Sequence, residues 1–165
     1  MKVSFITFAA LAAPLALGNP VPAANSSDVQ APGQPITPRQ IQGGGIIPSP
    51  MVDCGDVDLP EADWKGVIDK IKDYGIHGGK VQPKKIHVEY FGKAAFYMCN
   101  CKWFHWDPLP IQEISEAAEL ITKKCGPHQT GWVWANDWQK GYNIAPYSYV
   151  HGTDAPLLCP DECFN

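Results

Sequence analysis

The chain has 165 residues and carries 13 lysines and arginines against 17 aspartates and glutamates, which gives a formal net charge of −4. Beyond Arg39, its only arginine, every cation is a lysine. Nucleic-acid binders gather positive charge on one face and grip phosphates with the bidentate guanidinium group. The composition therefore argues against a nucleic-acid partner.

Residues 1–18 have the order of features that is typical of a secretion signal. Lys2 supplies a positive charge, an apolar run continues to Leu17, and small residues predict cleavage before Asn19. The run is shorter than the roughly 20 residues that a membrane span needs, and no later stretch approaches that length. We therefore expect a secreted, extracellular protein without a membrane span.

Residues 19–50 are rich in proline and glycine and contain no aromatic residue. Because such a segment cannot bury a core, it predicts either a disordered extension or a pro-segment that is cut after Arg39. The sequon at Asn25 lies within this segment, so any glycan there would be lost on processing.

The remaining residues, 51–165, form the expected cysteine-rich secreted domain. An even number of cysteines in an exported chain predicts a disulfide framework, and these cysteines are Cys54, Cys99, Cys101, Cys125, Cys159 and Cys163. A zinc site built from Cys99, Cys101, Cys159 and Cys163 is the alternative, and the oxidising secretory route argues against it. A free reactive thiol is disfavoured by the even count.

The first expected elements of this domain are a helix and a hairpin. The helix is capped by Asp58, has Pro60 in its first turn and ends at Gly75, with apolar residues at helical spacing from Trp64 to Tyr74. Two strands, 86–91 and 94–101, then flank Gly92-Lys93, a tight turn with glycine first. Cys99 and Cys101 share one face of the second strand, so they are poorly placed to bond to each other.

A second amphipathic helix follows Pro110 and ends at Gly126. Cys125 lies in its last turn, and we expect it to bond to Cys99 or Cys101. A strand at 131–134 follows, and the rest of the chain is expected to be loop-like, with a further strand near Val52 or near Tyr147. This order predicts an α+β fold, a small disulfide-stapled antiparallel sheet packed against two helices.

Several short motifs make the chain resemble fungal small secreted cysteine-rich proteins. They are Cys54-Gly55-Asp56, Phe96-Tyr97-Met98-Cys99, and the second helix, which contains residues 113–118 and ends in Lys124-Cys125-Gly126. Their order is loosely similar to the Ecp2-type effector domains and the killer-toxin-like domains. The resemblance implies a disulfide-bonded α/β sandwich without enzymatic activity.

No motif for catalysis, for a metal or for a cofactor stands out, so we predict no catalytic, metal or cofactor-binding residue. His105 with Asp107 is a candidate acid–base pair, and a locally bonded loop histidine is the simpler interpretation. Asp137 lies between two tryptophans that would desolvate its carboxyl group, which makes it the best candidate acid. The helix acids Glu113, Glu116 and Glu119 are expected on the solvent face, where a catalytic acid is out of place.

The tryptophans allow two interpretations. The candidate binding aromatics are Trp103, Trp106, Trp132, Trp134 and Trp138. They either fill the core or make a binding face, since flat rings stack on sugars and dominate protein interfaces. Trp132 and Trp134 share a strand face, so both should be buried or both available.

Two functions follow from these observations. The first is a non-enzymatic interaction protein, effector- or toxin-like, that binds an extracellular protein. The second is a cell-wall or carbohydrate-binding module that binds a polysaccharide, with a secreted hydrolase as its minor variant. The sequence leaves the partner and the oligomeric state open.

Overall fold

The structure, a computed structural model, describes residues 45–164 of the chain. The expected signal peptide, the sequon at Asn25 and the processing site at Arg39 lie outside the described residues. Within the described part of the chain, no helix combines the length and the apolar character that crossing a membrane requires.

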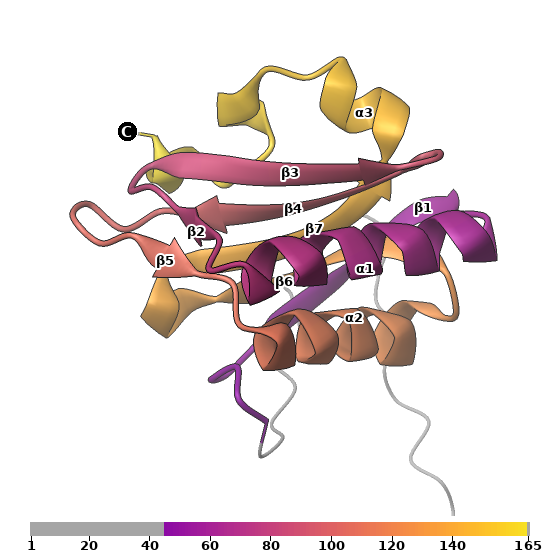
Figure 1. Ribbon diagram of the computed structural model, residues 1–165, viewed down its shortest axis with the longest axis horizontal. Helices are drawn as coiled ribbons and strands as arrows, with labels where there is room; N and C mark the ends of the chain where they lie inside the picture. Colours follow the sequence, from indigo (N-terminus) through magenta and orange to yellow (C-terminus); the bar gives the residue numbers. More distant parts are fainter. Residues whose placement is uncertain (1–44, 165) are drawn as a thin grey trace, which may run out of the picture. The chain divides into compact units, whose positions relative to one another are not determined.

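An antiparallel five-stranded sheet forms the centre of the fold, with strand order β1-β6-β7-β4-β3 (Figure 1). Its strands are β1 (Met51–Asp58), β3 (Lys85–Phe91), β4 (Ala94–Asn100), β6 (Gln129–Ala135) and β7 (Lys140–Pro146). A second sheet pairs β2 (Lys80–Val81) with β5 (Asp107–Pro108). The expected α+β class is confirmed.

Helices α1 (Glu61–Ile76) and α2 (Ile111–Cys125) cover one face of this sheet (Figure 1). Their apolar stripes pack on side chains that alternate along the strands, such as Phe96 and Met98 of β4 and Tyr142 of β7, and together these form the main core. The opposite face carries α3 (Tyr147–His151) and two 3₁₀ turns, η2 (Ala155–Leu157) and η3 (Asp161–Cys163). These C-terminal segments pack on a smaller second core that includes Tyr97 and Cys99.

The first helix differs from its expected limits at both ends. Asp58 belongs to β1, and Pro60 occupies the N-cap position without a side-chain cap. Gly75 lies inside the helix, where a Cβ atom would come within 2.2 Å of the carbonyl oxygen of Leu109. Glycine is therefore needed at residue 75 for close approach of the β5–α2 connection, and it does not stop the helix.

The hairpin has the expected two-residue turn. Phe91 pairs with Ala94 across it, and Gly92 has a φ of +54° that glycine adopts at little cost. The backbone amide of Lys93 in this turn donates to Oδ2 of Asp63 at 2.9 Å, which ties the turn to the first helix.

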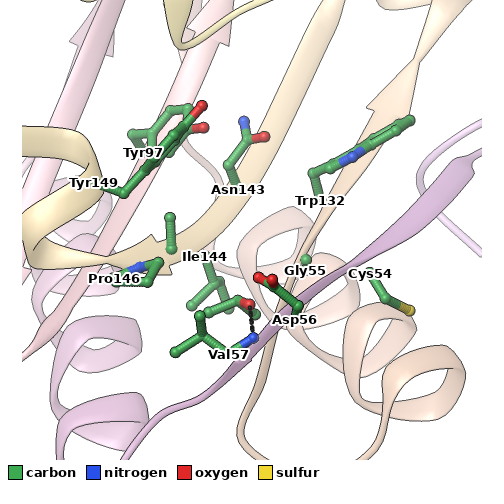
Figure 2. A pocket seen from close by; sticks show the side chains of 13 residues that line it. Cys54, Gly55, Asp56, Val57, Tyr97, Trp132, Asn143, Ile144, Pro146 and Tyr149 are labelled. Carbon is green, nitrogen blue, oxygen red and sulfur yellow. Dashed lines mark hydrogen bonds between the residues drawn. The ribbon is translucent and has the colours of Figure 1, made fainter. Parts of the chain in front are cut away.

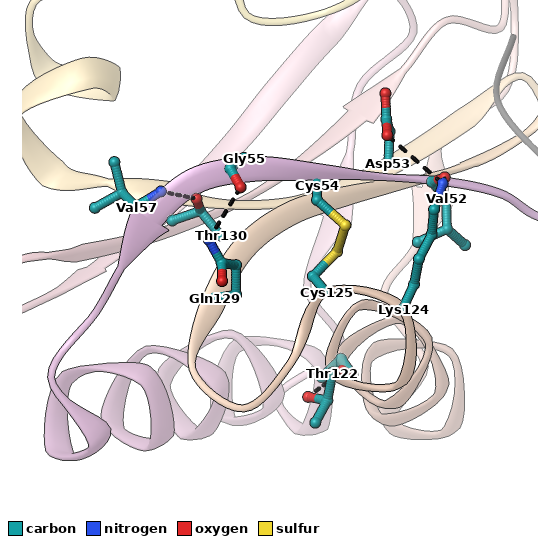
Figure 3. Close-up of a disulfide and its surroundings, with 11 residues drawn as sticks. Val52, Asp53, Cys54, Gly55, Val57, Thr122, Lys124, Cys125, Gln129 and Thr130 are labelled. Atoms are coloured by element: carbon teal, nitrogen blue, oxygen red, sulfur yellow. Dashed lines mark hydrogen bonds and ion pairs between the residues drawn. A yellow bond between two sulfur atoms is a disulfide. The ribbon is translucent and has the colours of Figure 1, made fainter. Parts of the chain in front are cut away.

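Three disulfides join Cys54 to Cys125, Cys99 to Cys159 and Cys101 to Cys163. The disulfide framework is confirmed, as is the separation of Cys99 from Cys101. The expected bond from Cys125 to one of these two cysteines is wrong. The side chain of Cys99 lies on the sheet face away from the helices, whereas the end of α2 meets Cys54 on β1 (Figure 3).

Two further expectations need correction. The segment after 134 contains β7, which pairs with both β4 and β6 in the middle of the sheet. The strand expected near Val52 is confirmed as β1, whereas Tyr147 itself begins the short helix α3 directly after β7. The folded part also begins before residue 51, because Ile47 is only 1% exposed and its amide donates to Oε2 of Glu116 at 3.2 Å.

Candidate functional site

The sheet face away from the helices is only partly covered, and strand register places a row of polar and aromatic side chains on its open part. Trp132 of β6 lies opposite Asp53 of β1 on one side and Asn143 of β7 on the other. Asn143 in turn lies opposite Tyr97 of β4. Figure 2 shows Tyr97, Asn143 and Trp132 on three adjacent strands, facing the same space.

Trp134 stands two residues further along β6, on the same face as Trp132. It lies opposite Gly141, and a Cβ atom on this glycine would come within 2.6 Å of the indole ring. The Trp134 ring therefore lies against the backbone of β7 at Gly141, in space that only glycine leaves open. Its Nε1–H donates to Oδ1 of Asn136 at 2.7 Å, which fixes the orientation of the ring.

Two adjoining cavities of about 390 and 610 Å³ lie over this face. Both are lined by Tyr97, Trp132, Asn143 and Tyr149, so we describe them together as the sheet groove. Trp134 and Asn136 line the larger cavity and Asp56 lines the smaller one. Trp132 and Trp134 are both half-buried, as their shared strand face requires.

The C-terminal tail forms one wall of the sheet groove. Residues 157–160 line the larger cavity, and the disulfide from Cys99 to Cys159 attaches them to β4. Tyr149 of α3 lines both cavities on this side. The C-terminal segments cover β4 and Ala145 near the end of β7, and they leave Trp132, Asn143 and the second half of β1 to line the groove.

The opposite wall is the second half of β1, whose pairing with β6 is irregular between Cys54 and Asp58. In Figure 3 the backbone N–H of Val57 donates to Oγ1 of Thr130 at 3.3 Å, and the Cys54–Cys125 disulfide joins this strand to α2. Both walls of the groove are therefore held by disulfides, which fixes the width of the groove before a ligand arrives.

The chemistry of the groove is aromatic and weakly charged. Asp56 is the only acid among the described residues that line the two cavities, and the amides of Asn136, Gln139 and Asn143 supply donors and acceptors. Burial raises the pKa of Tyr97, and the neighbouring Tyr149 adds to this shift, so the Tyr97 phenol stays neutral in neutral solution.

The remaining candidate aromatics lie elsewhere. Trp138 packs against the main core on the helix side, and Trp103 and Trp106 are exposed in the loop between β4 and β5. Only Trp64 among the six tryptophans is buried. Trp134 packs against the second core, so three of the six indoles contribute to core packing and Trp103, Trp106 and Trp132 do not.

The candidate catalytic residues are not brought together. His105 and Asp137 are exposed, and neither lines the sheet groove, so Asp137 lacks the desolvation expected from its tryptophan neighbours. Asp107 turns inward from His105 and lies within 3.2 Å of the buried Nζ of Lys140. The candidate acid–base pair does not form.

The helix acids have three different environments. Glu119 is exposed as expected, whereas Glu116 binds the backbone amides of Ile46 and Ile47. Glu113 was expected on the solvent face, and this is wrong: its Oε2 lies 2.7 Å from Nζ of Lys140 and accepts the hydroxyl of Tyr142. The amphipathic pattern of α2 does not reveal this, because the partner of Glu113 lies on a distant strand.

All six cysteines are consumed by disulfides, so the alternative zinc site at Cys99, Cys101, Cys159 and Cys163 does not form. Within residues 45–164, no cluster of three or more histidine, cysteine or acidic side chains is arranged to hold a metal ion. Comparisons of the chain with protein families, with curated proteins and with solved structures found no match.

Proposed function

We propose that this protein is a secreted, non-enzymatic binding protein that holds a segment of polysaccharide in the sheet groove. The observation that carries the proposal is the pair of half-buried indoles, Trp132 and Trp134, side by side on one face of β6. Side chains two apart on a strand are separated by roughly 7 Å, so the two indoles can contact successive sugars of one chain.

A glycan suits this platform better than a charged or a purely apolar ligand. Aromatic rings stack on the C–H faces of sugars, while amide groups bond to hydroxyls. The groove provides both, because Asn143 and Asn136 lie beside the indoles and Asp56 supplies one carboxylate. Rigid walls lower the entropy that binding would otherwise cost.

Binding without cleavage follows from the set of acids in the groove. Glycoside hydrolysis ordinarily uses two carboxyl groups that flank the scissile bond. Among the described lining residues Asp56 stands alone, so the groove lacks this pair. The hydrolase variant is therefore not part of the proposal.

The three disulfides suit an oxidising extracellular setting, which supports a secreted location. The effector- or toxin-like role remains a proposal that rests on the resemblance of the cysteine pattern. A protein that binds glycan fits this role if its target is the coat of a host or of a competing cell.

The test is a pull-down of the secreted protein with insoluble chitin, cellulose and β-glucan. We expect retention on at least one of them, and a loss of about tenfold or more in affinity for Trp132→Ala with Trp134→Ala. The matched control is Trp106→Ala, which removes an exposed indole outside the groove and should bind like the parent protein.

A conservative variant separates binding from folding. Trp132→Tyr keeps a flat ring and should retain most of the affinity, whereas Trp132→Ala should not, at an unchanged thermal unfolding midpoint. Retention on none of the three polysaccharides, together with an alanine double variant that fails to fold, would show that the indoles have only a structural role.

A further inference from the structure

The loop between β4 and β5 exposes three large aromatic side chains within four residues. Trp103 is 60% exposed, Phe104 84% and Trp106 55%, and we call these three residues the aromatic tip. In Figure 1 this loop extends beyond the end of β4, next to β2. Soluble proteins rarely expose such a cluster of apolar side chains unless it meets a partner.

The loop is held in place from both ends. The amide of Asn100, a buried side chain, donates to the carbonyl of His105 at 2.8 Å and to that of Val81 at 2.9 Å. Its Oδ1 accepts the backbone N–H of Lys102 at 3.1 Å, and Cys101 is bonded to Cys163. Exposure of the aromatic rings is thus a feature of an anchored loop.

Lysines surround the aromatic tip, although the chain as a whole has a net charge of −4. Nζ of Lys84 lies 3.8 Å from the ring centre of Trp103, and Lys80 lines a shallow hollow together with Trp106 and His77. Lys102 lies within the loop itself, and Lys85 begins β3. Because Lys102 is paired with Asp107, the positive charge at this end of the molecule comes from Lys80, Lys84 and Lys85.

Acids also lie at this end of the molecule. Asp107 follows the loop and is buried, with its oxygens 2.8 Å from Nζ of Lys102 and 3.2 Å from Nζ of Lys140. Asp73 lies beside His77 on the last turns of α1, next to the hollow. Asp161 is exposed on η3, two residues before the Cys163 that is bonded to Cys101. Lys80, Lys84 and Lys85 therefore face two exposed acids, Asp73 and Asp161, among the described residues at this end of the molecule.

We infer that the aromatic tip is a docking surface for an anionic lipid bilayer. Tryptophan is enriched at membrane interfaces because its ring is largely apolar and its N–H stays hydrated. Lysines around the rings would face the phosphate and carboxylate groups of anionic lipids, while the rings enter the boundary of the acyl chains. The contact is peripheral, and it uses a different part of the molecule from the sheet groove.

Charge is the reason to favour a membrane over a second glycan site at the tip. A ring cluster alone would also stack on sugars, but neutral polysaccharides gain nothing from surrounding lysines. An anionic surface strengthens binding about fivefold for each lysine close to it. A protein partner would need a concave apolar site to receive the projecting rings, and the described residues around the tip give no argument for such a partner.

The experiment is co-sedimentation of the full secreted chain with vesicles of phosphatidylcholine alone or mixed with phosphatidylserine. We expect binding to the mixed vesicles only, and weaker binding as salt is raised. Lys80→Gln with Lys85→Gln should weaken it about 25-fold. Trp103→Ser with Phe104→Ser should weaken it about tenfold or more, because the inserting rings are lost.

The matched control is Trp132→Ala, a groove variant that should bind vesicles like the parent protein. A direct measurement on the unmodified chain does not depend on any variant folding: brominated lipids in the mixed vesicles should quench part of its tryptophan fluorescence. Absence of quenching, equal binding to neutral vesicles, or loss of glycan binding in the tip variant would each overturn the inference.

Discussion

Replacement of Lys140 by methionine tests whether the buried ion cluster stabilises the fold. Lys140 is 1% exposed, and its Nζ lies 2.7 Å from Oε2 of Glu113, 3.2 Å from Oδ1 of Asp107 and 2.7 Å from the carbonyl oxygen of Pro108. Methionine fills similar volume but leaves two carboxylates without this cation. Each keeps one other contact, Asp107 with Lys102 and Glu113 with Tyr142.

Removal of one partner from a buried ion pair destabilises a protein by about 3–5 kcal/mol. The free energy of unfolding of a small domain is only about 5–15 kcal/mol, so Lys140→Met should remove a large share of it. Urea unfolding of the disulfide-intact protein, followed by tryptophan fluorescence, measures this loss. The matched control is Lys65→Met, which removes an exposed pair with Glu61 and should leave the urea midpoint unchanged.

A double variant shows whether the loss comes from the ion pair. Lys140→Met combined with Glu113→Gln should cost less than the sum of the two single losses, because the glutamine no longer leaves a buried charge. Stability of Lys140→Met within about 1 kcal/mol of the parent, or strict additivity with Glu113→Gln, would refute this account of the cluster.

Two further predictions concern the disulfide at β1 and the buried phenols. Cys54→Ser with Cys125→Ser opens a link with a sequence separation of 71 residues and should lower the free energy of unfolding by about 4 kcal/mol, which chemical denaturation measures. A loss below about 1 kcal/mol would show that the link hardly restrains the unfolded chain. Burial raises the pKa of Tyr97 and of Tyr142, and the nearby Glu113 carboxylate raises that of Tyr142 further. Because the phenols of the unfolded chain ionise first, at a pKa of about 10, the free energy of unfolding should stay constant below that pH and fall above it. The fall should be less steep in Tyr142→Phe, which lacks one of the two buried phenols. A titration followed by tyrosinate absorbance, in which all tyrosines ionise together, would contradict this prediction.

The sequence predicts correctly those elements that are determined by residues close together in the chain. The helix after Pro110 has a complete apolar stripe and a glycine at its end, and the structure places it at Ile111–Cys125 with Gly126 as its C-cap. The hairpin around Gly92 is equally self-contained. In both cases the residues that decide the element lie within a few positions of each other.

Elements that depend on distant partners are missed. Strand β7 begins with Lys140 and Gly141, residues that disfavour a strand, and its place is set by β4 and β6 on either side. Lys140 is accommodated there because acids from β5 and α2 surround it. The partner of Cys125 likewise depends on which strand passes the end of α2, and spacing in the sequence does not contain that information.

The sheet groove lies between these two cases. Alternation along β6 places Trp132 and Trp134 on one face, and the sequence predicts this directly. Whether that face is covered depends on the path of the tail, which is fixed by the disulfide from Cys99 to Cys159. Because the sequence does not show this disulfide, the alternation along β6 is equally consistent with two buried tryptophans and with two tryptophans open to a ligand.

The end of β4 connects the two surfaces proposed for binding. Its last residues alternate between the two faces of the sheet, so Cys99 anchors the tail wall of the groove and Asn100 anchors the aromatic tip. All of β4 is buried, which makes it a rigid support for both. The two indoles proposed to contact glycan lie on β6, whereas the aromatic tip lies in the β4–β5 loop, and the two surfaces have no lining residue in common. Variants of Trp132 and of Trp103 should therefore have independent effects, and for this reason each surface supplies the control for the other.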